Sequence, residues 1–281
     1  MAKDLKERYE EYKELGYTVF ERLHSKETTD GWIRKYHELQ QNTPRNADGT
    51  LTTWFASTCE LAPLEMLPIV SHPEILDFAE MVMGPFVQLD NLTIAGGERN
   101  VSKEEARNKV ALWHRDRWGK VPTTERYESP LSCNAISYMV DLDDDYGPLR
   151  VIPGSHRKPI TLTDEEIFVP HKDEVIVYAK AGDVVFTHNM LLHTGTPNTS
   201  GKNRYFFSVY YNRTWLRHTD NHSGPNVQKI VQQARLRNDH RTLRLFGIDE
   251  QLEKRANSGF RVADDIQWAE WAAADKAAIK K

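Results

Sequence analysis

The sequence predicts a mainly β fold with flanking α-helices, and two features of its patterning support this class. Between about residues 86 and 212, the apolar residues form eight short segments separated by Gly, Pro or Asp. Before and after this region, longer segments carry the spacing of amphipathic helices. Eight short strands with turn signals between them indicate an antiparallel sandwich or barrel. No glycine-rich turn of the dinucleotide or P-loop type is present, so a doubly wound α/β fold is not expected.

The N-terminal part is predicted to be mostly helical. Residues 4–15 form a helix that ends at Gly16, 17–23 a short strand, and 26–40 a second amphipathic helix. A polar loop follows over 41–52. A third helix is expected over 71–83, with Ser71 as its N-cap and Pro73 in its first turn.

The eight predicted strands make up the central part of the chain. They are VQLDNLTIA (87–95), VALWHRD (110–116), SCNAISYMVDL (132–142), PLRVIPG (148–154), EVIVYAK (174–180), DVVFTHN (183–189), LLHTG (191–195) and RYFFSVYYN (204–212). After residue 212 the chain turns polar and then helical. Because no repeat or linker interrupts it, we expect a single domain over 1–281, with a helical part (1–85), a β core (86–212) and a C-terminal helical extension (213–281).

Charge and composition indicate the kind of partner. Lys and Arg number 37 against 41 Asp and Glu, so the formal charge is -4 and no positive field exists to bind nucleic acid or an acidic membrane. No apolar run spans a bilayer and the N-terminus is charged, which predicts a cytoplasmic protein. Cys59 and Cys133 are too few and too far apart for a disulfide framework, so free thiols are expected. A small molecule is the expected partner.

The segment WHRDRW (113–118) contains the first candidate for chemistry. On a strand His114 and Asp116 point to the same side, whereas Arg115 points away. Imidazole and carboxylate together suit a borderline divalent cation, and two histidines with one carboxylate leave coordination positions open. A second histidine is therefore needed.

Two histidines, His188 and His193, compete for this position because both end the same strand region. A turn rich in Gly, Pro and Asn follows, and Arg204 then opens the next apolar strand. An arginine buried there implies an anionic partner, because a guanidinium binds a carboxylate through two hydrogen bonds and is costly to bury alone.

Three blocks in order resemble the phytanoyl-CoA dioxygenase family of iron(II)/2-oxoglutarate oxygenases. They are WHRD, the segment DLDDDYGPLRVIPGSHR (141–157), and His193 with Arg204 eleven residues later. The resemblance implies a double-stranded β-helix core, the cupin-like jelly roll, with helices packed outside. It also implies Fe(II) on His114, Asp116 and His193, and 2-oxoglutarate on Arg204. Only His193 fits the family spacing to arginine, so His188 is not expected to bind the metal. His156, in PGSH, is expected to be structural or on the surface.

The resemblance assigns further contacts. Asn91 and Asn134 align with residues that contact 2-oxoglutarate in relatives, whereas Gly195 stands where many members carry Ser or Thr. Trp118 is expected to cover the pocket, and the expected substrate contacts are Arg117, Trp118, Asn212 and Trp215. Positive charge near the pocket from Arg117, Arg150, Arg213 and Arg217 favours an anionic or zwitterionic small molecule.

The expected reaction, implied by the resemblance, is hydroxylation of an unactivated C–H bond of a specialised metabolite or amino-acid-like compound. O2 is consumed, and succinate and CO2 are released. The same ligands also permit desaturation or ring formation. Two alternatives of other classes are a jelly-roll binding protein without catalysis and a zinc hydrolase that uses a metal-bound water. Neither accounts for Arg204.

Overall fold

The computed structural model describes residues 3–97, 100–255 and 261–280. The chain divides into two compact units, one formed by Met1–Phe55 with Thr93–Ser208 and the other by Ala56–Leu92 with Val209–Lys281. The unit boundaries fall inside strands β3 (Val87–Ala95) and β9 (Phe206–Arg213). The single domain expected from the sequence stays a prediction.

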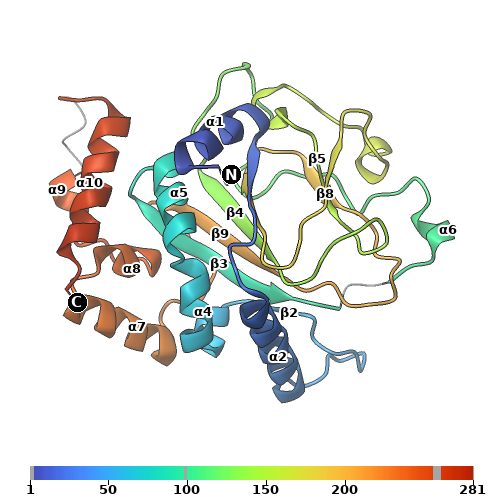
Figure 1. Cartoon of the computed structure of the whole chain (residues 1–281), viewed down its shortest axis with the longest axis horizontal. Coiled ribbons are helices and arrows are strands. Elements are labelled where there is room, and N and C mark those ends of the chain that lie inside the picture. Colours follow the sequence, from blue (N-terminus) through green and yellow to red (C-terminus); the bar gives the residue numbers. More distant parts are fainter. Residues whose placement is uncertain (1–2, 98–99, 256–260, 281) are drawn as a thin grey trace. The chain divides into compact units, whose positions relative to one another are not determined.

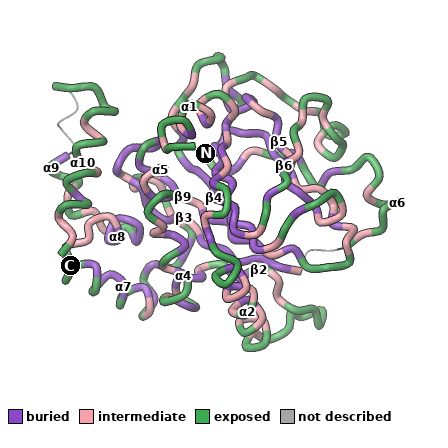
Figure 2. The backbone as a smooth tube through the Cα atoms, in the orientation of Figure 1, coloured by how far each residue is buried: buried purple, intermediate pink, exposed green. Residues whose placement is uncertain are grey.

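The first unit begins with the helices and strand that the sequence predicts. Helix α1 (Leu5–Leu15) starts at a capping box between Asp4 and Glu7 and ends at Gly16, which has a φ of 84°. Strand β1 (Tyr17–Phe20) follows, and then helix α2 (Lys26–Asn42) (Figure 1). These three predictions are confirmed. A short helix, α6 (Lys103–Ala106), has no buried residue and lies on the surface (Figure 2).

Antiparallel sheets form the rest of this unit. The larger sheet has the order β1-β7-β4-β9-β3-β2, with β2 at Trp54–Phe55, β4 at Ser132–Tyr138 and β7 at Val184–His188. The smaller sheet has the order β6-β5-β8, formed by Val175–Val177, Leu149–Val151 and His193–Gly195. Two 3-10 helices, η1 (Ser155–Arg157) and η2 (Glu166–Phe168), lie in the connections. The prediction of antiparallel strands with flanking helices is confirmed.

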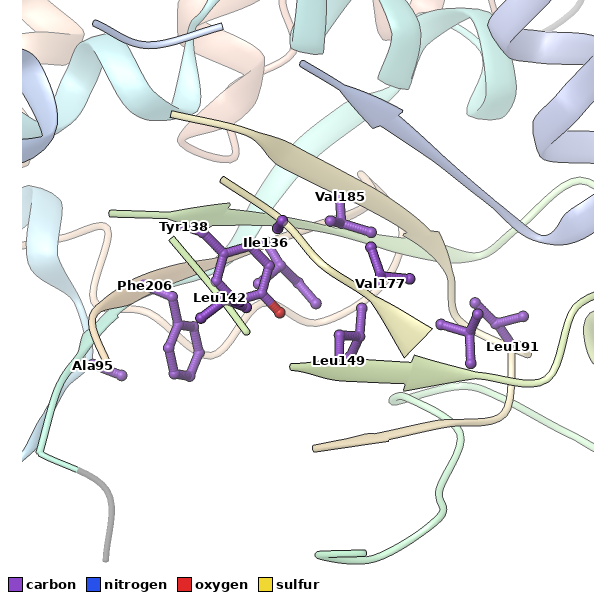
Figure 3. Packing of buried hydrophobic residues seen from close by; sticks show 11 residues of the cluster. Ala95, Ile136, Tyr138, Leu142, Leu149, Val177, Val185, Leu191 and Phe206 are labelled. Carbon is purple, nitrogen blue, oxygen red and sulfur yellow. The ribbon is translucent and has the colours of Figure 1, made fainter. Parts of the chain in front are cut away.

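The main apolar core of this unit takes side chains from both sheets (Figure 3). Ile136 and Val185 come from the larger sheet, and Leu149 and Val177 come from the smaller one. Removing this apolar surface from water is the dominant stabilising term for such a layer arrangement. The smaller sheet, which carries His193, is therefore anchored by its packing on the larger one.

The second unit contains the other helices. They are α3 (Thr58–Leu61), α4 (Pro63–Val70), α5 (Pro73–Met83), α7 (Pro225–Leu236), α8 (His240–Leu245), α9 (Leu252–Arg255) and α10 (Asp264–Ala278). Helix α7 packs on α3, α4 and α8, whereas α10 packs on α5 and α8. The buried Asp275 of α10 accepts hydrogen bonds from Arg244 at 3.0 Å and from Arg255 at 2.7 Å. The predicted C-terminal extension is thus fastened by buried charges.

Two sequence predictions are wrong in detail. Residues 110–116 form no regular strand, because the Leu112 backbone N–H donates to the Thr194 hydroxyl and only His114 forms a β-bridge, with His193. Ser71 is not the N-cap of α5; His72 is, and the Ser71 hydroxyl donates to the Leu67 carbonyl at the end of α4.

Helices α3 and α4 and strand β2 were not predicted from the sequence. The segment PLEMLPIV is almost uniformly apolar and contains an internal proline, so it lacks an amphipathic pattern. Cys59 and Cys133 are both buried thiols that form no disulfide. No helix among the described residues is long and apolar enough to cross a membrane.

Candidate metal centre

Within the described residues, His114, Asp116 and His193 form a cluster that could hold a metal ion. One potential ligand atom from each residue lies within 4.8 Å of the others. The backbone sets this arrangement: the N–H of His114 donates to the His193 carbonyl at 3.0 Å, and the N–H of His193 donates back at 3.1 Å. The Asp116 N–H donates to the Asn189 carbonyl at 3.0 Å. The predicted ligands therefore lie on two segments that are hydrogen-bonded to each other.

Both imidazole rings are oriented by a backbone carbonyl two residues earlier in the chain. Nδ1 of His114 lies 2.9 Å from the Leu112 carbonyl, and Nδ1 of His193 lies 3.0 Å from the Leu191 carbonyl. A carbonyl only accepts, so each Nδ1 carries the proton and each Nε2 keeps its lone pair. Burial lowers the pKa of His114, and the nearby His193 lowers it further, which favours the neutral ring that a metal needs.

The distances between these atoms fit one divalent cation. Nε2 of His114 and Nε2 of His193 lie 3.9 and 3.7 Å from Oδ1 of Asp116. Both separations are shorter than twice a metal–ligand bond of about 2.1 Å, so one ion can reach all three atoms. The Asp116 and His193 side chains are 3% and 6% exposed, whereas that of His114 is 45% exposed. The site therefore opens to solvent on the side of His114.

Arg204 lies beside the strand that carries His193. Its guanidinium is buried and donates through Nη1 to the Gly147 carbonyl. A Cβ placed on Gly195 would lie 3.5 Å from Nη2 of Arg204, an ordinary van der Waals distance. The guanidinium thus faces β8 at Gly195, two residues beyond the candidate ligand His193. A carboxylate group of a molecule bound at the metal could reach this guanidinium.

His188 and His156 lie in a separate buried cluster, with ring centroids 5.0 Å apart. Nε2 of His188 lies 3.0 Å from the Glu128 carbonyl, and its Nδ1 accepts the Met190 N–H, so both of its ring nitrogens are occupied within the protein. Burial lowers the pKa of His156 to about 4 and that of His188 to about 3. The arrangement suits a structural role for both histidines.

The other predicted contacts fall in both units. In the first unit, Asn134 on β4 is buried and accepts from the Ser208 hydroxyl at 3.2 Å, while Arg117 and Trp118 are exposed and follow Asp116. In the second unit, the Asn91 amide donates to Asp220 at 2.5 Å.

Two more predicted substrate contacts lie in the second unit, where Asn212 is buried and Trp215 is exposed. Their roles stay predictions, as do those of Asn91, Asn134, Arg117 and Trp118. Arg150, expected to add positive charge at the pocket, forms an ion pair with Glu174 and donates to Thr196 instead.

Asn189 was not identified from the sequence, although it supports the metal-ligand segment. Besides accepting the Asp116 N–H, it donates through Nδ2 to the Arg117 carbonyl at 3.2 Å. Arg115, predicted to point away from the metal, donates to the carbonyls of Met190 and Ile160 at 2.9 and 3.1 Å. A polar residue at the end of an apolar strand carries no sequence signal for such a role.

The chain is similar to known proteins in sequence and in fold. The sequence model of a family described as phytanoyl-CoA dioxygenase matches residues 12–206. The structure of HygX from Streptomyces hygroscopicus, with nickel and 2-oxoglutarate bound, has a TM-score of 0.63 and 14% identity, covering 78% of this chain and 90% of that chain.

Two proteins of nogalamycin biosynthesis are similar in fold as well. The non-heme alpha ketoglutarate dependent epimerase SnoN has a TM-score of 0.56 and 20% identity, covering 75% of this chain and 81% of that chain. The carbocyclase SnoK has the same TM-score and identity, covering 80% of this chain and 90% of that chain. At these identities the structural likeness shows a common fold.

Proposed function

The chain belongs to the phytanoyl-CoA dioxygenase family, and on this premise we propose that it is an iron(II)- and 2-oxoglutarate-dependent oxygenase that hydroxylates a small molecule. The core that carries the site is then the double-stranded β-helix, or jelly roll, of these enzymes. Fe(II) is the metal, 2-oxoglutarate and O2 are cosubstrates, and succinate and CO2 are co-products.

The observation that carries this proposal is the arrangement of His114, Asp116 and His193. Each histidine is held at Nδ1 by a carbonyl and offers Nε2 toward Oδ1 of Asp116. Two imidazoles and one carboxylate on one side of an ion leave the opposite positions free for other ligands. When bound there, iron(II) with 2-oxoglutarate and O2 supplies the oxidant for the substrate C–H bond.

The chain's own contribution is to hold and orient the reactants. Arg204 binds the far carboxylate of 2-oxoglutarate through its guanidinium fork, and its burial keeps water from competing. Asn134 is the polar side chain of the first unit proposed to contact the cosubstrate, and Asn91 is the one proposed from the second. The side of His114 that is open to solvent is where substrate enters. Arg117, Trp118, Asn212 and Trp215 are the proposed substrate contacts.

The type of product is a separate question from the class of enzyme. SnoN is a non-heme alpha ketoglutarate dependent epimerase and SnoK a carbocyclase of the same kind, so proteins of similar fold carry out reactions other than hydroxylation. Desaturation or ring formation is therefore the second candidate outcome for this chain. Mass spectrometry of the product distinguishes a gain of one oxygen from a loss of two hydrogens.

Anaerobic titration with Fe(II), followed by measurement of succinate formation from 2-oxoglutarate, tests the proposal. We expect one Fe(II) to bind per chain and succinate formation to rise when a suitable substrate is added. With Zn(II) in place of Fe(II), no succinate should form. A jelly-roll binding protein would form no succinate, and a zinc hydrolase would be active with Zn(II) and indifferent to 2-oxoglutarate. A panel of small metabolites that includes anionic, zwitterionic and neutral compounds identifies the substrate. A cytoplasmic location remains a prediction from composition.

A further inference from the structure

Trp118 occupies a backbone conformation that favours glycine. The Gly119 N–H donates to the Asp116 carbonyl at 2.9 Å, which closes a four-residue turn that begins at the candidate ligand Asp116. Trp118 is the third residue of this turn and has a φ of 65°. In a turn with positive φ at this position Gly or Asn is the usual residue, and a bulky side chain is strained.

The surroundings of the turn impose this conformation. Asn189 accepts the Asp116 N–H through its carbonyl and donates to the Arg117 carbonyl through its side chain. On the other side of Trp118, a Cβ on Gly119 would lie 2.6 Å from the Asn189 carbonyl oxygen, so the backbone there is closely packed. The turn cannot relax to suit Trp118, and the strain is retained in the fold.

The Trp118 side chain makes few contacts that could offset this strain. Its residue is 43% exposed, and among the described residues the indole has no hydrogen bond or ring contact. By contrast Trp113, five residues earlier, is 3% exposed and donates through Nε1 to the Val169 carbonyl at 2.9 Å. Strained residues persist where the surrounding structure imposes them, and they cluster at functional sites.

The position of Trp118 next to the metal ligands indicates what this function is. It lies two residues after Asp116, and His114 is the ligand that leaves the site open to solvent. Leu112, two residues before His114, is likewise exposed, at 42%. The segment that carries two ligands therefore presents large apolar side chains to solvent on both sides of them.

We propose that Trp118 is a platform on which a planar aromatic or conjugated ring of the substrate stacks as it approaches the metal. This inference rests on the proposed function, since it names the substrate class of the same site. An indole face attracts flat π-systems beyond the area that it buries, and it needs no charge on the substrate. The substrate class is accordingly a ring compound with a flat face rather than a small aliphatic amino acid.

A set of three variants separates a platform from a packing residue. Trp118→Gly should raise Tm by roughly 2 to 4 °C because it relieves the strained turn. Trp118→Phe should keep the aromatic face and a Tm within about 1 °C of the wild type. The matched control is Arg22→Gly, because Arg22 is exposed and has a φ of 53° in the same unit. This control variant should show a similar rise in Tm and no change in ligand binding.

Binding is measured with 2-naphthol and its saturated counterpart, decahydro-2-naphthol, on protein loaded anaerobically with Fe(II) and 2-oxoglutarate. The wild type, Trp118→Phe and Arg22→Gly should prefer 2-naphthol, whereas Trp118→Gly should bind it up to about tenfold more weakly and lose the preference. A wild type without preference, or a Trp118→Gly variant that binds as the wild type does or melts at a lower temperature, would overturn the proposal. Fe(II) retention is measured separately on the same protein preparations, loaded with Fe(II) alone. Loss of iron by the wild type would contradict the proposed function, whereas loss of the naphthol preference contradicts only the platform.

Discussion

His114 and His193 form an isolated antiparallel bridge, and their imidazole centroids lie 4.3 Å apart. The bridge is not part of a longer ladder, but a backbone hydrogen bond from the Ala111 N–H to the Gly195 carbonyl at 2.9 Å lies beside its reciprocal pair. These backbone hydrogen bonds hold two histidines that are distant in the sequence side by side. The bridge, the hydrogen bond from the Asp116 N–H to the Asn189 carbonyl and the carbonyls that orient the two rings together position the metal ligands.

The first prediction concerns the ligands. His114→Ala, Asp116→Ala and His193→Ala should each lower Fe(II) affinity by at least 100-fold, because each removes one of three protein ligands. His188→Ala should keep Fe(II) affinity, although it should melt at a lower temperature because His188 is fully buried. Anaerobic Fe(II) titration of the four variants, each checked by circular dichroism, decides the assignment. Wild-type affinity in the His193 variant would remove that residue from the site.

Arg204 is expected to act on the cosubstrate and not on the metal. Arg204→Lys keeps the charge but loses the guanidinium fork, so the 2-oxoglutarate concentration for half-maximal succinate formation should rise roughly 10- to 100-fold. Arg204→Ala should be nearly inactive, and both variants should retain Fe(II). Arg150→Lys is the control, because Arg150 is committed to Glu174 and Thr196. An unchanged 2-oxoglutarate requirement in both Arg204 variants would contradict the role.

The cluster of His156 and His188 predicts sensitivity to acid. Burial lowers the pKa of His156 to about 4 and that of His188 to about 3, whereas in the unfolded chain a histidine titrates near 6.5. As the pH falls below about 6.5, the unfolded chain takes up protons that the folded chain does not, so stability present at neutral pH is lost. Between pH 7.5 and pH 5, each of the two histidines should lower the free energy of unfolding by about 2 kcal/mol.

This acid sensitivity is measured as the change of Tm between pH 7.5 and pH 5. His188→Gln leaves an amide that can donate to the Glu128 carbonyl, which now faces the His188 ring, and it removes the titrating group. The decrease of Tm should be smaller in His188→Gln than in the wild type. His171→Gln, outside the cluster, should follow the wild type. Equal decreases in all three proteins would show that the buried histidine does not govern the acid response.

A fourth prediction tests the C-terminal helix. Burial acts to raise the pKa of Asp275, but Arg255 and Arg244 outweigh it and hold the pKa below its ordinary value. Asp275→Ala removes the shared partner of two buried arginines and should destabilise the second unit by about 3 to 5 kcal/mol. Asp265→Ala, at an exposed position in the first turn of α10, should cost no more than about 1 kcal/mol. Urea unfolding of the two variants makes the comparison, and similar midpoints would contradict it.

Much of the fold could be predicted because local patterns were strong. The capped helix from Asp4 to Gly16 and the strand at 87–95 carry complete signals in the sequence, and the structure forms both. Helix α4 could not be found, since its residues are apolar except for Glu65 and include an internal proline, so they show no helical periodicity. The ligand segment at 110–116 alternates like a strand, but its donors are shared between the Thr194 side chain and other segments, which no local pattern encodes.

The candidate site was predictable only in part, for a related reason. His114 and Asp116 are close in sequence, so their shared side is a local property, whereas the choice of His193 over His188 needed the spacing to Arg204. The role of Asn189 depends on a tertiary contact with the Asp116 turn and has no sequence signal. The strain at Trp118 is equally invisible, because a sequence does not reveal which residue takes a positive φ.

The last prediction uses the one departure from the family pattern near Arg204. The family resemblance implies Ser or Thr in many members at the position of Gly195. A Cβ added there would meet Nη2 and Nη1 of Arg204 at 3.5 and 3.8 Å and the Ala111 Cβ at 4.0 Å. These are ordinary contact distances, and Gly195 has no positive φ, so a serine fits without displacing its neighbours. Its hydroxyl would add one hydrogen bond to the bound carboxylate, or to the guanidinium that holds it.

Gly195→Ser should therefore lower the 2-oxoglutarate concentration for half-maximal succinate formation by about 3- to 10-fold, which corresponds to the net contribution of one ordinary hydrogen bond. Gly147→Ser is the contrasting variant, because Gly147 has a φ of 71° and a Cβ there would lie 2.7 Å from the Thr196 carbonyl oxygen. It should melt at a lower temperature and bind the cosubstrate more weakly, since its carbonyl accepts from Arg204. Steady-state titration of both variants with 2-oxoglutarate makes the test. If Gly195→Ser instead raised the 2-oxoglutarate requirement, the prediction would be wrong. The carboxylate would then occupy the space between Gly195 and Arg204 that the serine side chain fills.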